Sequence, residues 1–191
     1  MPYNSIDKTE VIGVYRIQPK VFGDERGWYC PNVEFSELEK ALKISFRNIT
    51  QLASSYNSKA GILRGMHYQL SPNTQGKLVM ATRGSVLDVA LDVRKNSPTF
   101  GKYITAILTS TNQNQLWVPP GCAHGYLALE PNTTFSYIVT DGKYSPDLER
   151  GVNPFDPNLN IPWGMSRESM DLKERDLNLR NFEDIPKDEL L

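Results

Sequence analysis

The sequence has 191 residues, with 21 basic and 22 acidic side chains and a formal net charge of −1 at pH 7. That length fits a single domain, spanning residues 1–191, which can bury most of its apolar surface without disulfide bonds. The balanced charge excludes a broad basic surface for nucleic acid, although it permits a local group of arginines around a small anion.

Cysteine spacing and hydropathy indicate which cellular compartment to expect for the protein. The two cysteines, Cys30 and Cys122, do not form a C-x-x-C pair, and the chain opens without an apolar secretory segment. No apolar run approaches the roughly 20 residues that a membrane helix needs. We therefore expect a cytoplasmic protein without membrane contact.

The first elements predicted along the chain are a strand, a turn and a helix. Alternation over residues 11–22 predicts a half-buried strand, residues 23–27 predict a tight charged turn, and apolar spacing in residues 35–43 predicts a short helix. We expect the strand near residues 11–17 to be exposed, so that it can pair with the sheet of a partner subunit.

The rest of the chain alternates between short strand candidates and turn residues. The strand candidates cover residues 46–54, 61–70, 77–82, 86–93, 103–109, 115–118, 125–129 and 134–140. Eight short strands with few helices between them indicate an all-β fold, an antiparallel sandwich or barrel. The polar stretch of about residues 166–191 is interpreted as a C-terminal arm rather than a further domain.

The only two histidines of the chain, His67 and His124, occupy similar settings. Each lies at the end of a predicted strand beside glycine or proline turn residues. Imidazole is the side chain whose ordinary pKa lies nearest neutrality, so acid/base chemistry is one interpretation and two structural histidines are the other. The histidines are 57 positions apart and no third one exists, so we expect no metal site.

Two further polar residues alternate with apolar ones in predicted strands. Asp88 shares one face with small apolar residues, so it needs a partner: it is oriented by an arginine, it orients an imidazole, or it belongs to an ion pair at the rim. Tyr137 is either a core tyrosine or an inward-facing phenol, and its pattern alone favours the core.

Four basic residues lie at predicted strand ends or beside glycine, as anchors for an anionic substrate would. They are Arg26, Arg64, Lys77 and Arg94. The guanidinium fork suits a diphosphate, but four basic residues could equally belong to a solvated face.

Six segments, in this order, resemble the dTDP-4-dehydrorhamnose 3,5-epimerase family. They are VFGDERG (21–27), LRGMHYQ (63–69), QGKLV (75–79), DVALDVR (88–94), SPTFG (97–101) and HGY (124–126). The resemblance runs from about residue 14 to residue 176. It implies a cupin-type jelly-roll, a homodimer without metal or cofactor, and a dTDP-linked 4-keto-6-deoxy sugar as substrate.

The resemblance also implies roles for individual residues. It makes His67 the base, Asp176 the carboxylate that pairs with this imidazole, Tyr137 the proton donor and Lys77 the group that stabilises the enolate oxygen. His124 with Asp88 becomes a second imidazole–carboxylate pair near the sugar. The remaining implied substrate contacts are Arg26 and Arg64 at the diphosphate, Tyr144 on the thymine, and Gln51, Glu149 and Arg175.

Two alternatives stay open beside the 3,5-epimerase. One is a 3- or 5-mono-epimerase of a related nucleotide sugar, and the other is a non-catalytic jelly roll that only binds a sugar nucleotide. The chain departs from the family pattern at Cys30-Pro31, at Leu52-Ala53 and by one extra residue near Gly142, in segments that the resemblance assigns to nucleotide binding.

Overall fold

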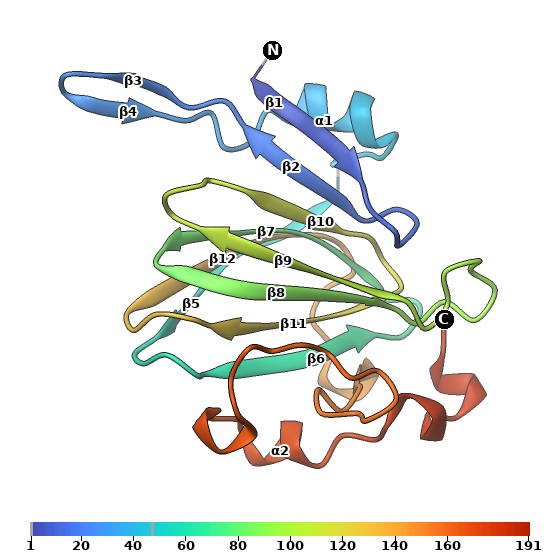
Figure 1. Ribbon diagram of the computed structural model, residues 1–191. Coiled ribbons are helices and arrows are strands. Elements are labelled where there is room, and N and C mark those ends of the chain that lie inside the picture. The colour runs from blue at the N-terminus through green and yellow to red at the C-terminus, as the bar shows by residue number, and fades with distance from the viewer. Residues whose placement is uncertain (1, 47) are drawn as a thin grey trace.

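The computed structural model describes residues 2–46 and 48–191, which form two β-sheets packed face to face, with a long C-terminal arm beneath them (Figure 1). The strands are β1 Tyr3–Lys8, β2 Tyr15–Pro19, β3 Phe22–Asp24, β4 Gly27–Tyr29, β5 Ile49–Asn57, β6 Leu63–Gln69, β7 Gln75–Arg83, β8 Ser85–Asp92, β9 Tyr103–Thr109, β10 Gln115–Val118, β11 Cys122–Ala128, β12 Thr133–Asp141 and β13 Glu149–Gly151. The helices are α1 Phe35–Leu42 and α2 Glu174–Leu177, with 3-10 turns η1 Pro146–Leu148, η2 Arg167–Ser169, η3 Phe182–Asp184 and η4 Lys187–Glu189.

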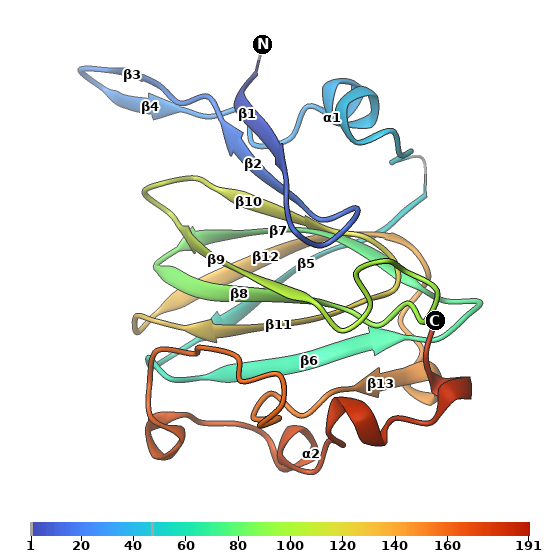
Figure 2. The ribbon, with the colours of Figure 1, turned by 45° about the vertical axis from the view of Figure 1, so that its right-hand side comes forward.

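The two large sheets are antiparallel and stay separate. One has six strands in the order β1-β2-β10-β7-β12-β5, and the other has five in the order β13-β6-β11-β8-β9. β3 and β4 pair only with each other, as a hairpin that projects from the body in Figures 1 and 2. The expectation of an all-β sandwich is confirmed.

Three apolar clusters hold these layers together. The first lies between the sheets and joins Val79 and Phe135 of one sheet to Ala90 and Tyr126 of the other. The second lies between the outer face of the five-stranded sheet and the C-terminal arm, and the third lies between the outer face of the six-stranded sheet and α1. All eight residues of β8 are buried, because apolar layers cover this strand on both faces.

The C-terminal arm is attached to the body at both of its ends. Near its start, Asp171 forms a β-bridge with Ile62, just before β6. At its end, the Lys95 N–H donates to the Leu191 carbonyl over 2.6 Å. Within this arm, residues 166–191, the helical segments are η2, the four residues of α2, η3 and η4. None of the helices in residues 2–46 and 48–191 is long and apolar enough to span a membrane.

The sequence-based prediction was wrong at the N-terminus. Instead of one strand over residues 11–22, β1 and β2 flank a turn at Gly13, whose φ is +86°, and Val11 and Val14 are buried beneath that turn. Because these two buried residues are apolar, the sequence around the turn resembles the alternating pattern of a strand. β2 pairs with both β1 and β10, so at this end of the sheet the edge strand is β1 and not the strand that was expected there.

β6 carries an irregularity that decides which way its side chains face. In its pairing with β11, His67 lies opposite His124 while Arg64 lies opposite Tyr126, so β6 has one extra residue in this interval. In a regular strand, residues 64 and 67 would point to opposite faces. The bulge turns both side chains toward the space between the sheets.

Glycine allows the two backbones to approach closely at this bulge. Gly65 has a φ of +115°, and a Cβ atom on it would lie 2.7 Å from the Gly125 Cα atom and 2.7 Å from the His124 carbonyl oxygen. A Cβ on Gly125 would lie 2.9 Å from the Arg64 carbonyl oxygen. Side chains at either position would push the strands apart.

We predict that Gly65→Ala lowers the free energy of unfolding by about 2–4 kcal/mol, because strain at positive φ adds to a backbone clash. Gly164→Ala is the matched control, since Gly164 has a φ of +78° but a Cβ atom on it would have no neighbour within 4 Å. It should cost only about 1 kcal/mol. Urea unfolding of both variants measures the difference, and equal losses would contradict the proposed clash.

Candidate active site

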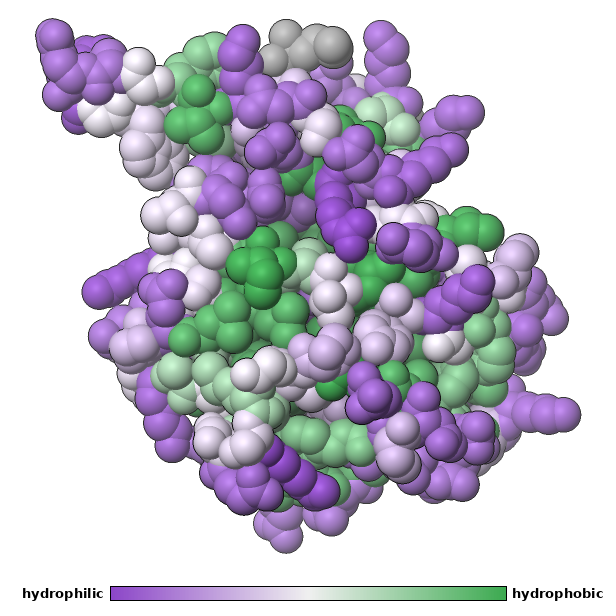
Figure 3. Space-filling view, in the orientation of Figure 1, coloured by the Kyte–Doolittle hydropathy of each residue, from purple (hydrophilic) through white to green (hydrophobic). Residues whose placement is uncertain are grey.

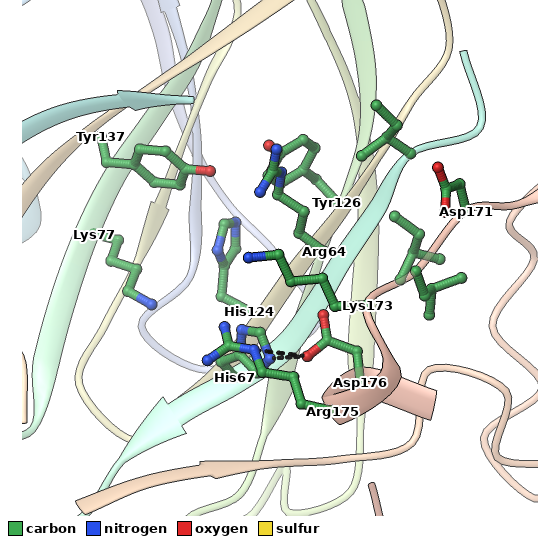
Figure 4. A pocket seen from close by; sticks show the side chains of 13 residues that line it. Arg64, His67, Lys77, His124, Tyr126, Tyr137, Asp171, Lys173, Arg175 and Asp176 are labelled. Carbon is green, nitrogen blue, oxygen red and sulfur yellow. Dashed lines mark hydrogen bonds and ion pairs between the residues drawn. The ribbon is translucent and has the colours of Figure 1, made fainter. Parts of the chain in front are cut away.

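A pocket of about 340 Å³ opens between the two sheets on the side that the C-terminal arm covers (Figure 4). β6 and β11 contribute one wall, β7 and β12 the opposite wall, and the arm closes one side. The lining residues are Ile62, Leu63, Arg64, His67, Lys77, His124, Tyr126, Tyr137, Asp171, Leu172, Lys173, Arg175 and Asp176. All four predicted catalytic residues are among them.

The strand register explains why the two histidines meet. His67 on β6 lies directly opposite His124 on β11, and His124 in turn lies opposite Ala90 on β8. Asp88, two residues along β8 from Ala90, is therefore a diagonal neighbour of His124 on the same face. Residues far apart in the sequence become one polar row through antiparallel pairing alone.

His67 is held by a carboxylate that the arm supplies. The His67 Nε2 atom lies 2.8 Å from Asp176 Oδ1, and the side chains are 19% and 4% exposed. Asp176 also accepts a 3.4 Å hydrogen bond from the Gly65 N–H and lies 3.4 Å from Arg175 Nε. Because Nε2 donates to the carboxylate, Nδ1 keeps its lone pair and can accept a proton.

The environment of Asp176 keeps it ionised. Burial would raise its pKa, but the hydrogen bond and charge of His67, the Gly65 N–H and Arg175 together outweigh burial and lower the pKa of this carboxyl. An ionised carboxylate stabilises the imidazolium that forms when His67 accepts a proton. The pair is thus suited to general-base chemistry.

The second imidazole–carboxylate pair lies deeper. His124 Nε2 is 2.7 Å from Asp88 Oδ1, and the two side chains are 4% and 0% exposed. Burial raises the pKa of Asp88, although the charges of His124 and Lys77 oppose the rise. The second carboxylate oxygen of Asp88 is buried and has no hydrogen-bond partner among the described residues. The expectation that Asp88 is paired is confirmed, and its partner is an imidazole rather than an arginine.

Lys77 and Tyr137 come from the opposite sheet. Lys77 lies across the ladder from Val139, and Tyr137 from Val79, so the Lys77 and Tyr137 side chains are diagonal neighbours on one face. The Tyr137 hydroxyl lies 3.0 Å from Ser55 Oγ. In Figure 4 this hydroxyl and the Lys77 ammonium both point into the pocket.

Burial shifts the pKa of each group in the direction that favours its neutral form. It raises the pKa of the Tyr137 phenol well above its usual value, so the phenol keeps its proton until a strong base develops nearby. It lowers the pKa of the Lys77 ammonium, against the opposing charges of Glu149 and Asp88.

The predicted binding residues fall into two groups. Arg64 and Arg175 line the pocket, and Glu149 lies beside it, with its Oε2 atom accepting from Arg175 at 3.0 Å and from the Tyr144 hydroxyl at 3.3 Å. Tyr144 is 56% exposed at this rim.

The other predicted anchors lie outside the pocket of their own chain. Arg26 is at the tip of the β3–β4 hairpin, with its side chain 85% exposed beside Asp24. Gln51 lies on the edge strand β5. Arg94 binds the buried Asp92 elsewhere, with its Nε atom 2.7 Å from that carboxylate.

Sequence reasoning missed three polar residues of the pocket, Tyr126, Asp171 and Lys173. Tyr126, whose hydroxyl lies 2.7 Å from Ser55 Oγ, has the pattern of an ordinary core tyrosine. Lys173 belongs to the polar arm, where spacing does not distinguish a pocket residue from a solvated one. Among the residues that the structure describes, no group of three or more His, Cys, Asp or Glu side chains is arranged to hold a metal ion.

Comparison with known proteins assigns this arrangement to a family. Residues 8–184 match the family described as dTDP-4-dehydrorhamnose 3,5-epimerase. The chain belongs to that family. It is 42% identical over 182 residues to the dTDP-4-dehydrorhamnose 3,5-epimerase of Shigella flexneri, covering 94% of this chain and 97% of that one.

Solved structures agree with this family assignment. The dTDP-4-dehydrorhamnose 3,5-epimerase of Elizabethkingia anophelis superposes with a TM-score of 0.90 at 36% identity, covering 96% of this chain and 98% of that one. A dTDP-6-deoxy-D-glucose-3,5-epimerase from Legionella pneumophila, solved in complex with dTDP-4-keto-L-rhamnose, also has a TM-score of 0.90, at 38% identity and 97% and 96% coverage. These likenesses confirm the expected cupin-type fold class.

We predict that Asp176→Asn makes this epimerase-family chain less stable at pH 7, and that the difference shrinks in acid. A carboxyl whose pKa is lowered in the fold contributes stability above its unfolded pKa of about 3.9, and loses it as the pH falls through the folded value. Urea unfolding of both proteins between pH 7 and pH 3 measures the difference. A difference that stays constant over that range would show that the charge of Asp176 contributes nothing.

Proposed function

We propose that this chain is a dTDP-4-dehydrorhamnose 3,5-epimerase, which converts dTDP-4-dehydro-6-deoxy-D-glucose to dTDP-4-dehydro-L-rhamnose. One observation carries the proposal: a carboxylate-paired imidazole on one sheet and a protonated phenol on the other face the same pocket. A base and an acid on opposite sides of a sugar ring can remove a proton from one face and return it to the other.

The 4-keto group of the substrate makes this chemistry possible. It acidifies the hydrogens on C3 and C5, so His67 can take either proton and leave an enolate. Lys77 projects into the pocket from the opposite wall and would stabilise the enolate oxygen. Tyr137 then donates its proton to the other face of the carbon, which inverts it, and recovers a proton from His67 through the solvent.

The second pair, His124 and Asp88, would bind the sugar. The His124 imidazole stacks over Phe135 with ring centroids 6.2 Å apart and meets the Tyr137 ring edge-on at 6.3 Å. This packing and the 2.7 Å bond to Asp88 fix the imidazole rigidly. A rigid polar group at the floor of the pocket can orient the ring relative to base and acid, where a displacement of about 1 Å matters.

The outer part of the site binds the nucleotide in this proposal. Arg64 is assigned to the diphosphate, and Arg175, Glu149 and Tyr144 form the rim toward the thymine. Gln51 and Arg26 complete the binding set, but neither lies in the pocket of its own chain. Their contribution requires a second copy of the chain.

We further propose that the protein is a homodimer whose β3–β4 hairpin reaches the neighbouring pocket. The hairpin projects from the body (Figure 3), and Phe22, Trp28 and Tyr29 on it are 46%, 60% and 68% exposed. A two-stranded hairpin is at best marginally stable alone in water, so exposed aromatic residues on it favour burial against a partner. Docking of this hairpin would bring Arg26 to the diphosphate.

Proton NMR of dTDP-4-dehydro-6-deoxy-D-glucose in deuterium oxide tests the activity. The wild-type protein should exchange the protons at both C3 and C5, and a 4-reductase should convert the product to the L-rhamnose nucleotide. Exchange at one carbon would indicate a mono-epimerase instead. Binding without exchange would indicate a sugar-nucleotide-binding protein.

We predict different losses for the base and the acid. His67→Ala should abolish exchange at both carbons, because the pocket offers no second base in that position. Tyr137→Phe should retain more exchange than net inversion, because a proton can still leave but its return from the other face is hindered. Equal losses of exchange and inversion in Tyr137→Phe would remove the donor role from this residue.

Mixing two defective variants tests whether Arg26 contributes to the pocket of the partner subunit. His67→Ala should be inactive, and Arg26→Ala should be impaired at low substrate concentration. If Arg26 serves the partner's pocket, a hybrid dimer has one site with both residues intact and recovers activity after the variants are mixed and reassembled. No recovery in a sample that light scattering shows to be dimeric would contradict an action in trans.

A further inference from the structure

The arm places a lysine in the pocket that neither the resemblance nor the mechanism uses. Lys173 immediately precedes α2, and its carbonyl oxygen accepts from the Asp176 N–H at 2.9 Å and from the Leu177 N–H at 3.2 Å. Its backbone is therefore fixed by the helical turn. Figure 4 shows its side chain extended into the pocket, between Arg64 and Arg175.

The carboxylates that line the pocket already have partners. Asp171 pairs with Lys59 at 2.8 Å, and Asp176 with His67 at 2.8 Å. Arg175 lies 3.0 Å from the Glu149 carboxylate. Within residues 2–46 and 48–191, the Lys173 side chain itself has no hydrogen-bond or ion-pair partner.

Arg64, on the β6 wall, is another cation of the pocket without an ion-paired carboxylate among the described residues. Its guanidinium donates to two neutral oxygens, Asn57 Oδ1 at 3.1 Å and the Tyr56 carbonyl at 3.3 Å. These bonds orient the guanidinium without neutralising it. Two uncompensated positive charges therefore face the same pocket from different walls, one from β6 and one from the arm.

We propose that Lys173 binds the substrate diphosphate from the arm side, opposite Arg64, so that the two cations clamp it. This inference rests on the proposed function, whose substrate carries one strongly anionic group. A guanidinium presents a fixed fork of donors, whereas an ammonium on a flexible stem can follow either phosphate. Since no described carboxylate competes for it, the Lys173 charge is available for that contact.

Binding of dTDP, measured by calorimetry, tests the clamp separately from turnover. Lys173→Gln should weaken dTDP binding about tenfold, as expected for the loss of one charge-assisted contact, and leave the weaker binding of thymidine unchanged. Lys173→Arg, which keeps the charge, should restore most of the dTDP affinity. Lys187→Gln is the matched control, the same substitution in the same arm at an exposed residue outside the pocket.

Kinetics with the sugar nucleotide provide a second readout. Lys173→Gln should raise KM about tenfold, with most of the loss in kcat/KM falling on KM. If the wild type epimerises its substrate but Lys173→Gln binds dTDP as the wild type does, the clamp is wrong and the proposed function stands. If the wild type binds dTDP through Lys173 but exchanges no proton, the clamp stands and the proposed function is wrong.

Discussion

The close approach of β6 and β11 at two glycines is the constraint on which the site depends. Gly65 and Gly125 let the strand backbones meet where a Cβ atom would lie within 3 Å of main-chain atoms. The bulge that accompanies this contact reverses the alternation of β6, so that Arg64 and His67 face one pocket. The Gly65 N–H also holds Asp176. A single backbone irregularity thus orients three residues: His67, the proposed base, Arg64, the proposed diphosphate contact, and Asp176, the carboxylate bonded to His67.

Environment, rather than residue type, distinguishes the two imidazole–carboxylate pairs. Both bonds are short, yet the pKa of Asp176 is lowered and that of Asp88 is raised. Asp176 receives the Gly65 N–H and the charge of Arg175 in addition to His67, while one oxygen of Asp88 is buried without a partner among the described residues. Proteins commonly separate acid and base roles in this way, by giving like groups unlike surroundings. The pair at the pocket wall therefore suits proton transfer and the deeper pair suits positioning.

Local patterns in the sequence predicted the strands well but predicted poorly what joins distant segments. β9 and β10 begin and end at the expected residues, because Gly, Pro and Asn turns bound clear apolar runs. β1 was missed because its polar sequence, YNSIDK, is typical of an exposed edge rather than a core strand. The two histidines could be singled out by their rarity, but their pairing depends on strand register. The positions of Arg26 and Gln51 outside the pocket could not be predicted. No local sequence pattern distinguishes a residue that lines the pocket of its own chain from one that lies at an exposed edge.

The 109-residue separation between His67 and Asp176 has a consequence for biosynthesis. Chains fold from their N-terminal parts as they are made, so β6, with its imidazole, can pair while the arm is still being synthesised. Strands β1 to β13 all precede α2, which delivers the carboxylate to the finished sandwich. A nascent or truncated sandwich would therefore hold a histidine without the group that orients it. The order of the chain makes the His67–Asp176 pair one of the last contacts that this protein can form.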